Sequence, residues 1–231
     1  MLDLVVSHYN EDLRWLKKVP AEFRIVLYSK GNKAPDLSFL ECERLLVQLP
    51  NVGREAHTWM AYLENVVEDP PQGAVFLQGH PFDHCHDAHQ RLKALASGLA
   101  DLPPSGFEWW GFIIETDDPM GRRVFVSWSK NEDSRELDIG KRFEAVFHHS
   151  GPNPYRFYPG GQFVVTGEAI KRNSQAFYRR VRELLETDED AAYCLERFWD
   201  QIFGVIAITD TMMGGEETVY LKKIKRLDPG V

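Results

Sequence analysis

Short apolar runs that alternate with amphipathic helical segments limit the possible folds of this chain more than any other feature. Residues 2–9 and 23–29 are apolar runs of strand length, and a short helical stripe that ends at Pro20 lies between them. Strand, helix and strand in this order are typical of a parallel sheet covered by helices. The sequence predicts further strands at residues 74–77, 110–114, 162–165 and 219–224.

Helical periodicity supplies the elements that would cover such a sheet. Ala56, Trp59, Met60, Leu63 and Val67 recur at the spacing of one helix face. Similar patterns predict helices over residues 87–100, 177–185 and 190–202, whereas residues 117–160 show no clear period. We therefore predict an α/β fold, a single domain over residues 1–231 with a mostly parallel central sheet flanked by helices.

Composition excludes several classes of protein. Hydrophobic residues make up 43% of the chain and charged residues 27%, which is too apolar for a disordered protein. The net charge of −8 argues against general nucleic-acid binding. No apolar stretch reaches the roughly 20 residues that a membrane helix needs. We also expect no signal peptide, and three widely spaced cysteines disfavour a disulfide framework, so we expect a cytoplasmic protein.

Polar residues gather where the predicted strands end and where the helix over 56–67 begins. Open α/β sheets bind their ligands at the carboxyl ends of parallel strands, so these residues are candidates for substrate binding. Arg54 follows Gly53 at a helix N-terminus, a combination that suits an anionic group such as phosphate. The alternative is that these are ordinary caps and loops. The candidates are Ser7, His8, Asn10, Glu11, Asn51, Arg54, Glu55, Gln78, His80 and Asp83.

A histidine-rich run and an acidic turn are candidate metal sites. His80, Asp83, His84, Cys85, His86 and His89 lie within ten residues, and such ligands bind zinc or a similar divalent ion. The spacing matches no closed structural zinc site, so loop histidines or substrate-binding histidines are the alternative. The acidic turn at residues 115–118 follows a predicted strand and is a rival site for Mg²⁺ or Mn²⁺.

Glu196 and Asp200 lie four residues apart on the predicted helix over 190–202. Like charges at this spacing destabilise a helix, so Glu196 is a candidate general base facing a site, with a solvated helix face as the alternative. Two basic clusters are either solvated faces or contacts to an RNA backbone. They contain Arg179 and Arg182 in one cluster and Lys222 and Lys223 in the other.

Five ordered blocks carry a resemblance to a known family. They are VVSHYNEDLRWL, LPNVGREAHTWMAYLENV, VFLQGHPFDH, YPGGQFVVTGEAI and LERFWDQIFG, which together run from residue 2 to about residue 204. The chain resembles the family called domain of unknown function 3431, and this family in turn is distantly similar to GT-A glycosyltransferases.

The resemblance implies a nucleotide-linked donor, a GT-A-like fold and a catalytic carboxylate at Glu196. In GT-A enzymes the strand before the reaction centre ends in an Asp-x-Asp metal motif, but here it ends in Gln78, Gly79 and His80. Asp83 and His84 would replace the missing ligands for Mn²⁺ or Mg²⁺, or the site works without metal. We expect His80 and Asp83 at the reaction centre and Gln162 among the substrate-binding residues.

Two other functions compete with glycosyl transfer. The chain also resembles arginine-containing cyclodipeptide synthases, which take aminoacyl groups from tRNA. In that hypothesis acidic residues bind the arginyl guanidinium, and the clusters at Arg179/Arg182 and Lys222/Lys223 contact tRNA. The third hypothesis is a non-catalytic module that uses the old nucleotide pocket to bind a ligand.

Overall fold

The computed structural model describes residues 1–122 and 136–221, which include a six-stranded and a three-stranded sheet. The larger sheet has the order β3-β2-β1-β4-β8-β5. Strands β3, β2, β1 and β4 are parallel neighbours, whereas β8 is antiparallel to β4 and β5. This confirms the mostly parallel sheet. Its strands are β1 (Leu2–His8), β2 (Phe23–Ser29), β3 (Arg44–Gln48), β4 (Gly73–Gln78), β5 (Phe107–Trp109) and β8 (Phe163–Thr166).

Alternate residues of the central strands build one core on each face of this sheet, because successive side chains of a strand point in opposite directions. Val5 of β1 and Phe76 of β4 belong to the core beneath α1 (Arg54–Val66) and α5 (Gln175–Thr187). Their neighbours Leu4 and Val75 belong to the core on the opposite face. Two helices also contribute to that second core, η1 (Leu13–Lys18) and α2 (Ala88–Ala96).

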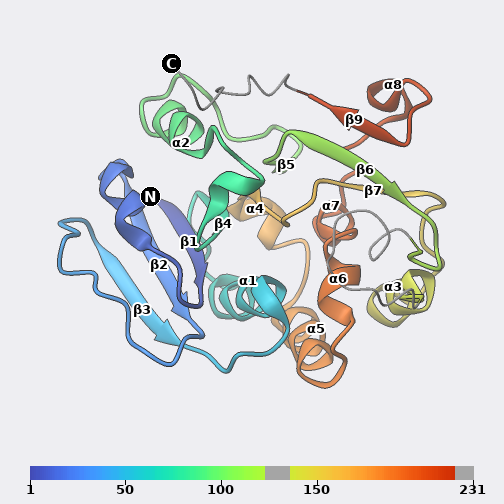
Figure 1. The fold of residues 1–231 in the computed structure, drawn as a ribbon, viewed down its shortest axis with the longest axis horizontal. Helices are drawn as coiled ribbons and strands as arrows, with labels where there is room; N and C mark the ends of the chain where they lie inside the picture. The colour runs from blue at the N-terminus through green and yellow to red at the C-terminus, as the bar shows by residue number, and fades with distance from the viewer. Residues whose placement is uncertain (123–135, 222–231) are drawn as a thin grey trace, which may run out of the picture.

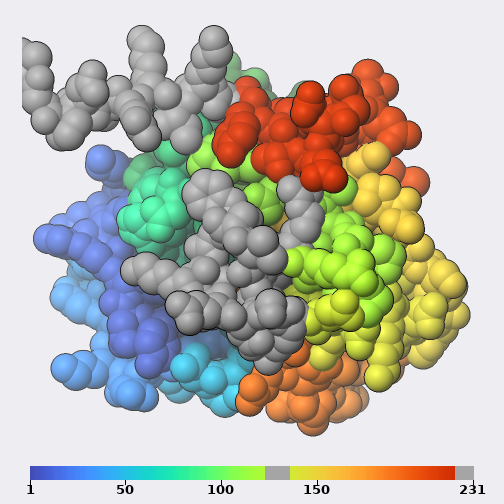
Figure 2. Space-filling view, turned by 45° about the vertical axis from the view of Figure 1, so that its right-hand side comes forward, coloured from blue at the N-terminus to red at the C-terminus, as the bar shows by residue number. Residues whose placement is uncertain are grey.

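The smaller sheet lies beside the larger one and contains β6 (Ile113–Asp117), flanked by β7 (Tyr155–Phe157) and β9 (Thr218–Tyr220). Figures 1 and 2 show it on the right, with the N-terminal strands on the left. One continuous core cluster includes residues of both sheets. The remaining elements are η2 (Pro81–Asp83), α3 (Ile139–Phe147), α4 (Gly167–Ile170), α6 (Ala191–Leu195), α7 (Trp199–Ile202) and α8 (Asp210–Met213).

Two predicted elements are wrong. The predicted strand over 110–114 falls mostly between two strands, because β5 already ends at Trp109 in the larger sheet and β6 begins only at Ile113 in the smaller one. The predicted helix over 190–202 is also interrupted, between α6 and α7. The carboxylate of Asp200 accepts the backbone N–H groups of Gln201 (2.8 Å) and Ala207 (3.1 Å), and so holds the chain that turns away after α7.

Several smaller differences follow from local hydrogen bonds and exposure. The first helix is a 3-10 helix capped by Asp12, whose carboxylate accepts the N–H of Arg14 at 2.9 Å. Strand β3 was not predicted, because most of its residues are exposed and its sequence lacks alternation. Among the described residues, no helix is long and apolar enough to cross a membrane.

Candidate functional site

A polar pocket of about 490 Å³ opens at the carboxyl ends of β1 and β4. These strands are parallel neighbours in which Ser7 pairs with Gln78, so the residues that follow each strand meet at one edge of the sheet. A second pocket of about 490 Å³ adjoins the first, and both are lined by His8 and Glu11. The first pocket is lined by Ser7, His8, Tyr9, Glu11, Arg54, Glu55, Gln78, His80 and Asp83.

The turn after β1 is held by its own hydrogen bonds. The Glu11 carboxylate accepts the backbone N–H of Tyr9 at 2.7 Å and that of Asn10 at 3.2 Å. Gly79 passes so close that a Cβ atom there would lie 2.5 Å from Oε2 of Glu11. The turns after β1 and β4 therefore pack directly on each other, and Gly79 permits this approach.

Two residues at the end of β1 are anchored to neighbouring elements. Ser7 shares a hydrogen bond of 3.0 Å with Thr58 of α1, and the buried His8 ring lies 3.3 Å from the Ser29 hydroxyl. Burial lowers the pKa of His8, and the charge of Glu11 opposes this shift. His8 thus offers a mainly neutral imidazole between the two pockets.

The start of α1 has an unusual backbone. Gly53 and Arg54 have φ values of +58° and +49°, a region that side chains other than glycine seldom adopt. A Cβ atom on Gly53 would lie 2.9 Å from Cβ of Leu185, so α1 begins in close contact with α5. The ammonium of the buried Lys30 donates hydrogen bonds to the carbonyls of Val52 (2.6 Å) and Arg54, which stabilises this turn.

Arg54 and Glu55 form the charged wall of the pocket. The Arg54 guanidinium lies 4.9 Å from the centre of the Tyr193 ring and 3.2 Å from its hydroxyl. Nε of Arg54 is 3.8 Å from the Glu55 carboxyl, and the side chain of Glu55 is only 14% exposed. Burial raises the pKa of Glu55, opposed by Arg54 and reinforced by the negative charge of Glu196.

Glu196 lies behind this wall and has partners of its own. Its carboxylate accepts the N–H of Gly160 at 2.6 Å and pairs with Arg197 at 2.6 Å. Arg197 also pairs with the buried Asp117 at 3.3 Å. The structure therefore brings Glu196 near Arg54 and Glu55, but as part of a structural ion-pair chain and not among the residues that line the pocket.

The remaining predicted site residues are dispersed. His80 and Asp83 are exposed at the pocket mouth, with 3.6 Å between Nδ1 and Oδ2. Asn51 is exposed upstream of Gly53. Gln162 is fully buried and donates to the Pro81 carbonyl at 3.1 Å, so it braces the turn after β4 and does not line the pocket.

The predicted metal ligands do not converge. Asp83 is exposed beside His80, whereas the His84 ring packs against Gly160, where a Cβ atom would lie 2.5 Å from it. Of the other histidines of the run, His89 lies against the Trp15 and Phe82 rings with its Nε2 3.0 Å from the Trp15 carbonyl, and the exposed His86 ring lies 5.1 Å from the Phe112 ring. Within residues 1–122 and 136–221, no three His, Cys, Asp or Glu side chains are grouped to hold a metal ion.

The rival acidic turn lies elsewhere, beside a pocket of about 420 Å³ at the smaller sheet. Asp117 is bound to Arg197, and the Asp118 carboxylate accepts the N–H groups of Met120 (2.7 Å) and Gly121 (3.1 Å). Both carboxylates therefore have structural roles.

Comparison with known proteins places the chain in a family. The family described as "Protein of unknown function (DUF3431)" matches residues 4–214. The chain belongs to this family. The resemblance inferred from the five sequence blocks is thereby confirmed. No curated protein sequence matches the chain.

Three solved structures are distant neighbours of this DUF3431 protein. A fragment of S. aureus TarS, residues 1–349, shares 14% identity with a TM-score of 0.37, covering 85% of this chain and 55% of that fragment. Mouse xyloside xylosyltransferase 1 shares 11% identity with a TM-score of 0.31, covering 88% and 80%. HddC from Yersinia pseudotuberculosis shares 9% identity with a TM-score of 0.29, covering 75% and 80%. The chain thus spans about half the length of the TarS fragment.

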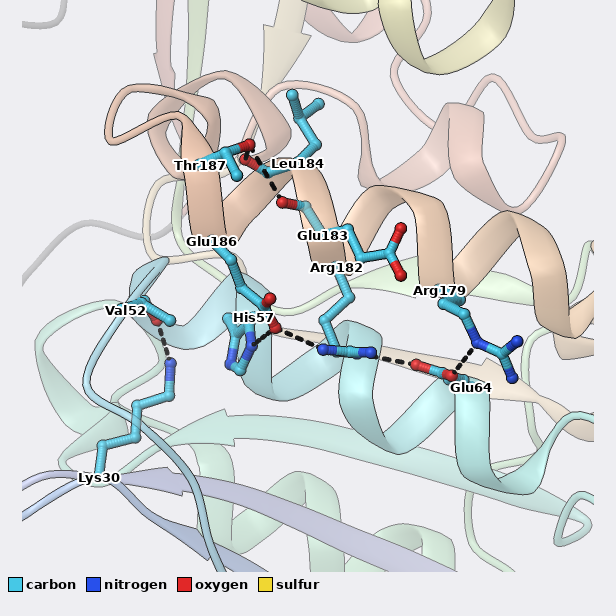
Figure 3. Close-up of polar contacts among 10 residues, drawn as sticks. All are labelled: Lys30, Val52, His57, Glu64, Arg179, Arg182, Glu183, Leu184, Glu186 and Thr187. Atoms are coloured by element: carbon cyan, nitrogen blue, oxygen red, sulfur yellow. Dashed lines mark hydrogen bonds and ion pairs between the residues drawn. The ribbon is translucent and has the colours of Figure 1, made fainter.

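The basic cluster on α5 of the DUF3431 protein is largely neutralised by neighbouring groups. Figure 3 shows Arg179 and Arg182 pointing at Glu64 of α1, with distances of 2.7 Å and 2.8 Å. Arg182 also pairs with Glu186, which lies 3.1 Å from His57. These contacts give no support to tRNA binding at this cluster. Lys222 and Lys223 lie outside the described residues.

Two residues of the site were missed by sequence reasoning. Lys30 follows β2 directly, so its position at a strand end was a usable signal, but a lone lysine there resembles any surface residue. Tyr193 lies on α6, 139 residues from Arg54, and no local pattern links the two.

Proposed function

We propose that this protein is a group-transfer enzyme that binds a nucleotide-linked donor across the two adjoining pockets. The observation that carries this proposal is Arg54, a cation placed at the start of a 13-residue helix on the wall of a polar pocket. Helix N-termini and arginine forks both favour anionic groups, and a diphosphate is such a group.

The two pockets suit the two parts of such a donor. The second pocket adds Lys17, Lys33 and Phe39 to the residues of the β1 turn, and Lys17 lies 5.1 Å from the Phe39 ring centre. Cations and an aromatic side chain are suitable for a phosphorylated nucleoside. The donor's diphosphate would then reach Arg54, and its transferred group would lie near Gln78, His80 and Asp83.

Glu196 is the predicted base of this proposal, and its contacts set a condition for that role. Because Gly160 and Arg197 already bind its carboxylate, it would need to exchange a partner in order to accept a proton from an acceptor. Because Asp83 and His84 do not converge, the predicted Mn²⁺ or Mg²⁺ would bind here only with the donor's phosphates as ligands.

Isothermal titration with uridine and guanosine diphosphate, each with and without Mn²⁺, tests the proposal. Arg54→Met should weaken binding about 10–100-fold, as expected for loss of a charge-assisted contact. Arg179→Met is the matched control. The side chain of Arg179 is 51% exposed and that of Arg54 is 55% exposed, but Arg179 lies on the α1–α5 surface, which we define by Glu64, Arg179, Arg182 and Glu186. Binding unaffected by Arg54→Met, or a response to tRNA and none to diphosphates, would contradict the proposal.

A further inference from the structure

Carboxyl groups line the pocket that we propose for an anionic ligand. A nucleotide diphosphate needs a positive environment, but the residues that line the pocket include the carboxyl groups of Glu11, Glu55 and Asp83. The Glu11 carboxylate accepts hydrogen bonds from two backbone N–H groups, and the Asp83 carboxyl is exposed to solvent beside His80. Glu55 is the carboxyl group beside Arg54, so its state decides whether that arginine offers a net positive charge.

The surroundings of Glu55 disfavour a negative charge there. Its side chain is 14% exposed, and a Cβ atom on Gly161 would lie 4.0 Å from its Oε1. Glu196 adds a second carboxylate nearby, and Glu196 is the one that Arg197 and the Gly160 N–H stabilise as an anion. When two carboxyl groups share a region, the one with weaker partners keeps its proton.

We propose that Glu55 binds the anionic part of the ligand in its protonated form, donating a hydrogen bond to an oxygen atom that Arg54 also contacts. This inference rests on the proposed function and makes it more specific: the ligand is a phosphate-type anion whose binding is coupled to one proton. Burial raises the pKa of Glu55, in agreement with this role, and a bound anion raises it further. Besides the groups already named, four ionisable side chains act on Glu55 or share its pocket, namely Lys30, His8, Tyr9 and His80.

The first experiment measures the protonation of the Glu55 carboxyl as a function of pH, without ligand. Carbon-13 NMR of protein labelled at the glutamate carboxyl carbons, with the resonance assigned by its loss in Glu55→Gln, gives the titration of this residue. We expect it to titrate above the ordinary glutamate value, to shift downward in Glu196→Gln and to shift upward in Arg54→Met. Glu186→Gln is the control that leaves the Glu55 resonance unchanged, since Glu186 belongs to the α1–α5 surface. Titration of Glu55 at or below the ordinary value would overturn the inference.

The second experiment measures how anion binding depends on the protonation of Glu55, with inorganic pyrophosphate as the probe. For the wild type, affinity should fall by up to about tenfold per pH unit above the Glu55 midpoint, relative to Glu55→Gln, which keeps its hydrogen-bond donor at every pH. The probe's own protonation is the same for both proteins, so the difference in slope belongs to residue 55. Equal slopes would overturn the inference while leaving the anion site intact. Failure of pyrophosphate and nucleoside diphosphates to bind would instead contradict the proposed function, and the NMR titration would still report on Glu55 alone.

Discussion

Helix α1 carries similar charged residues in two regions that use them in different ways. At its first turn, Arg54 and Glu55 face a pocket, with 3.8 Å between them and a strained backbone held by Lys30. Further along, Glu64 accepts hydrogen bonds from Arg179 and Arg182 at 2.7 Å and 2.8 Å, and Figure 3 shows Arg182 between the carboxylates of Glu64 and Glu186. Satisfied ion pairs indicate a structural surface, whereas loosely paired charges at a pocket indicate a binding site.

The pKa directions agree with this contrast. Burial alone would raise the pKa of Glu64, but its hydrogen bonds from Arg179 and Arg182 outweigh burial and the pKa is lowered. The pKa of Glu186 is also lowered, chiefly by its hydrogen bond with His57. For Glu55 burial prevails and the pKa is raised.

The largest expected effect comes from the residue that anchors both regions. Trp59 is fully buried on α1, packs edge-on against Phe76 at 5.2 Å and donates to the Gly161 carbonyl at 3.1 Å. Trp59→Ala should lower the free energy of unfolding by about 3–5 kcal/mol, because it leaves a cavity and an unpaired carbonyl. Urea denaturation measures this, and a loss below about 1 kcal/mol would mean that α1 is anchored elsewhere.

Removing the acceptor of the α1–α5 surface should have the next largest effect. Glu64→Gln leaves Arg179 without a carboxylate and Arg182 with Glu186 alone, and we expect a loss of about 1.5–3 kcal/mol in the free energy of unfolding. Diphosphate binding should stay unchanged, since the pocket is not involved. Glu68→Gln, at an exposed position in the turn after α1, is the control. A binding defect in Glu64→Gln would break the distinction between the two regions.

Lys30→Met should disturb the pocket more than the stability of the protein. The substitution removes two hydrogen bonds to the turn at Val52 and Arg54, and we expect a loss of about 1–2 kcal/mol in the free energy of unfolding. The strained backbone of Arg54 should relax, so diphosphate affinity falls as well. Calorimetry and urea denaturation of the same variant separate the two effects; weakened stability with full affinity would mean that Lys30 does not position Arg54.

Burial lowers the pKa of Lys30 to about 8, from the ordinary lysine value of 10.5. The unfolded chain therefore binds more protons than the folded one between these values, and the contribution of this group to stability rises with pH across that window. The difference in unfolding free energy between the wild type and Lys30→Met should accordingly increase above about pH 8. A flat difference would show that the ammonium is solvated in the folded protein.

The smallest expected effects are two pH dependences of opposite sign. The raised pKa of Glu55 contributes stability at low pH that is lost as pH rises through the folded value, so the wild type weakens relative to Glu55→Gln. The lowered pKa of Glu186 contributes stability at neutral pH that is lost as pH falls. The Glu186 effect is a few tenths of a kcal/mol, because the pair is partly exposed. If the contributions of Glu55 and Glu186 to the unfolding free energy changed with pH in the same direction, the contrast between the pocket and the α1–α5 surface would be wrong.

Local patterns in the sequence were sufficient for most of the fold. Hydrophobic periodicity located β1, β2, β4 and α1, and the five blocks identified the family, because burial on a sheet or helix face repeats at a fixed spacing. The polar residues after β1 and β4 were also predicted to meet, since parallel neighbours end at the same edge. Their roles in binding and catalysis remain predictions.

The tertiary structure alone decided which charged residues pair with each other. Arg179 and Glu64 are 115 residues apart, and Arg54 and Tyr193 are 139 apart, so no spacing rule could join them. The path of the chain after α7 likewise depends on where the carboxylate of Asp200 finds its N–H donors. Periodicity is a property of neighbouring residues, whereas the energy of a charge depends on everything that packs around it, and only the folded chain brings those groups together.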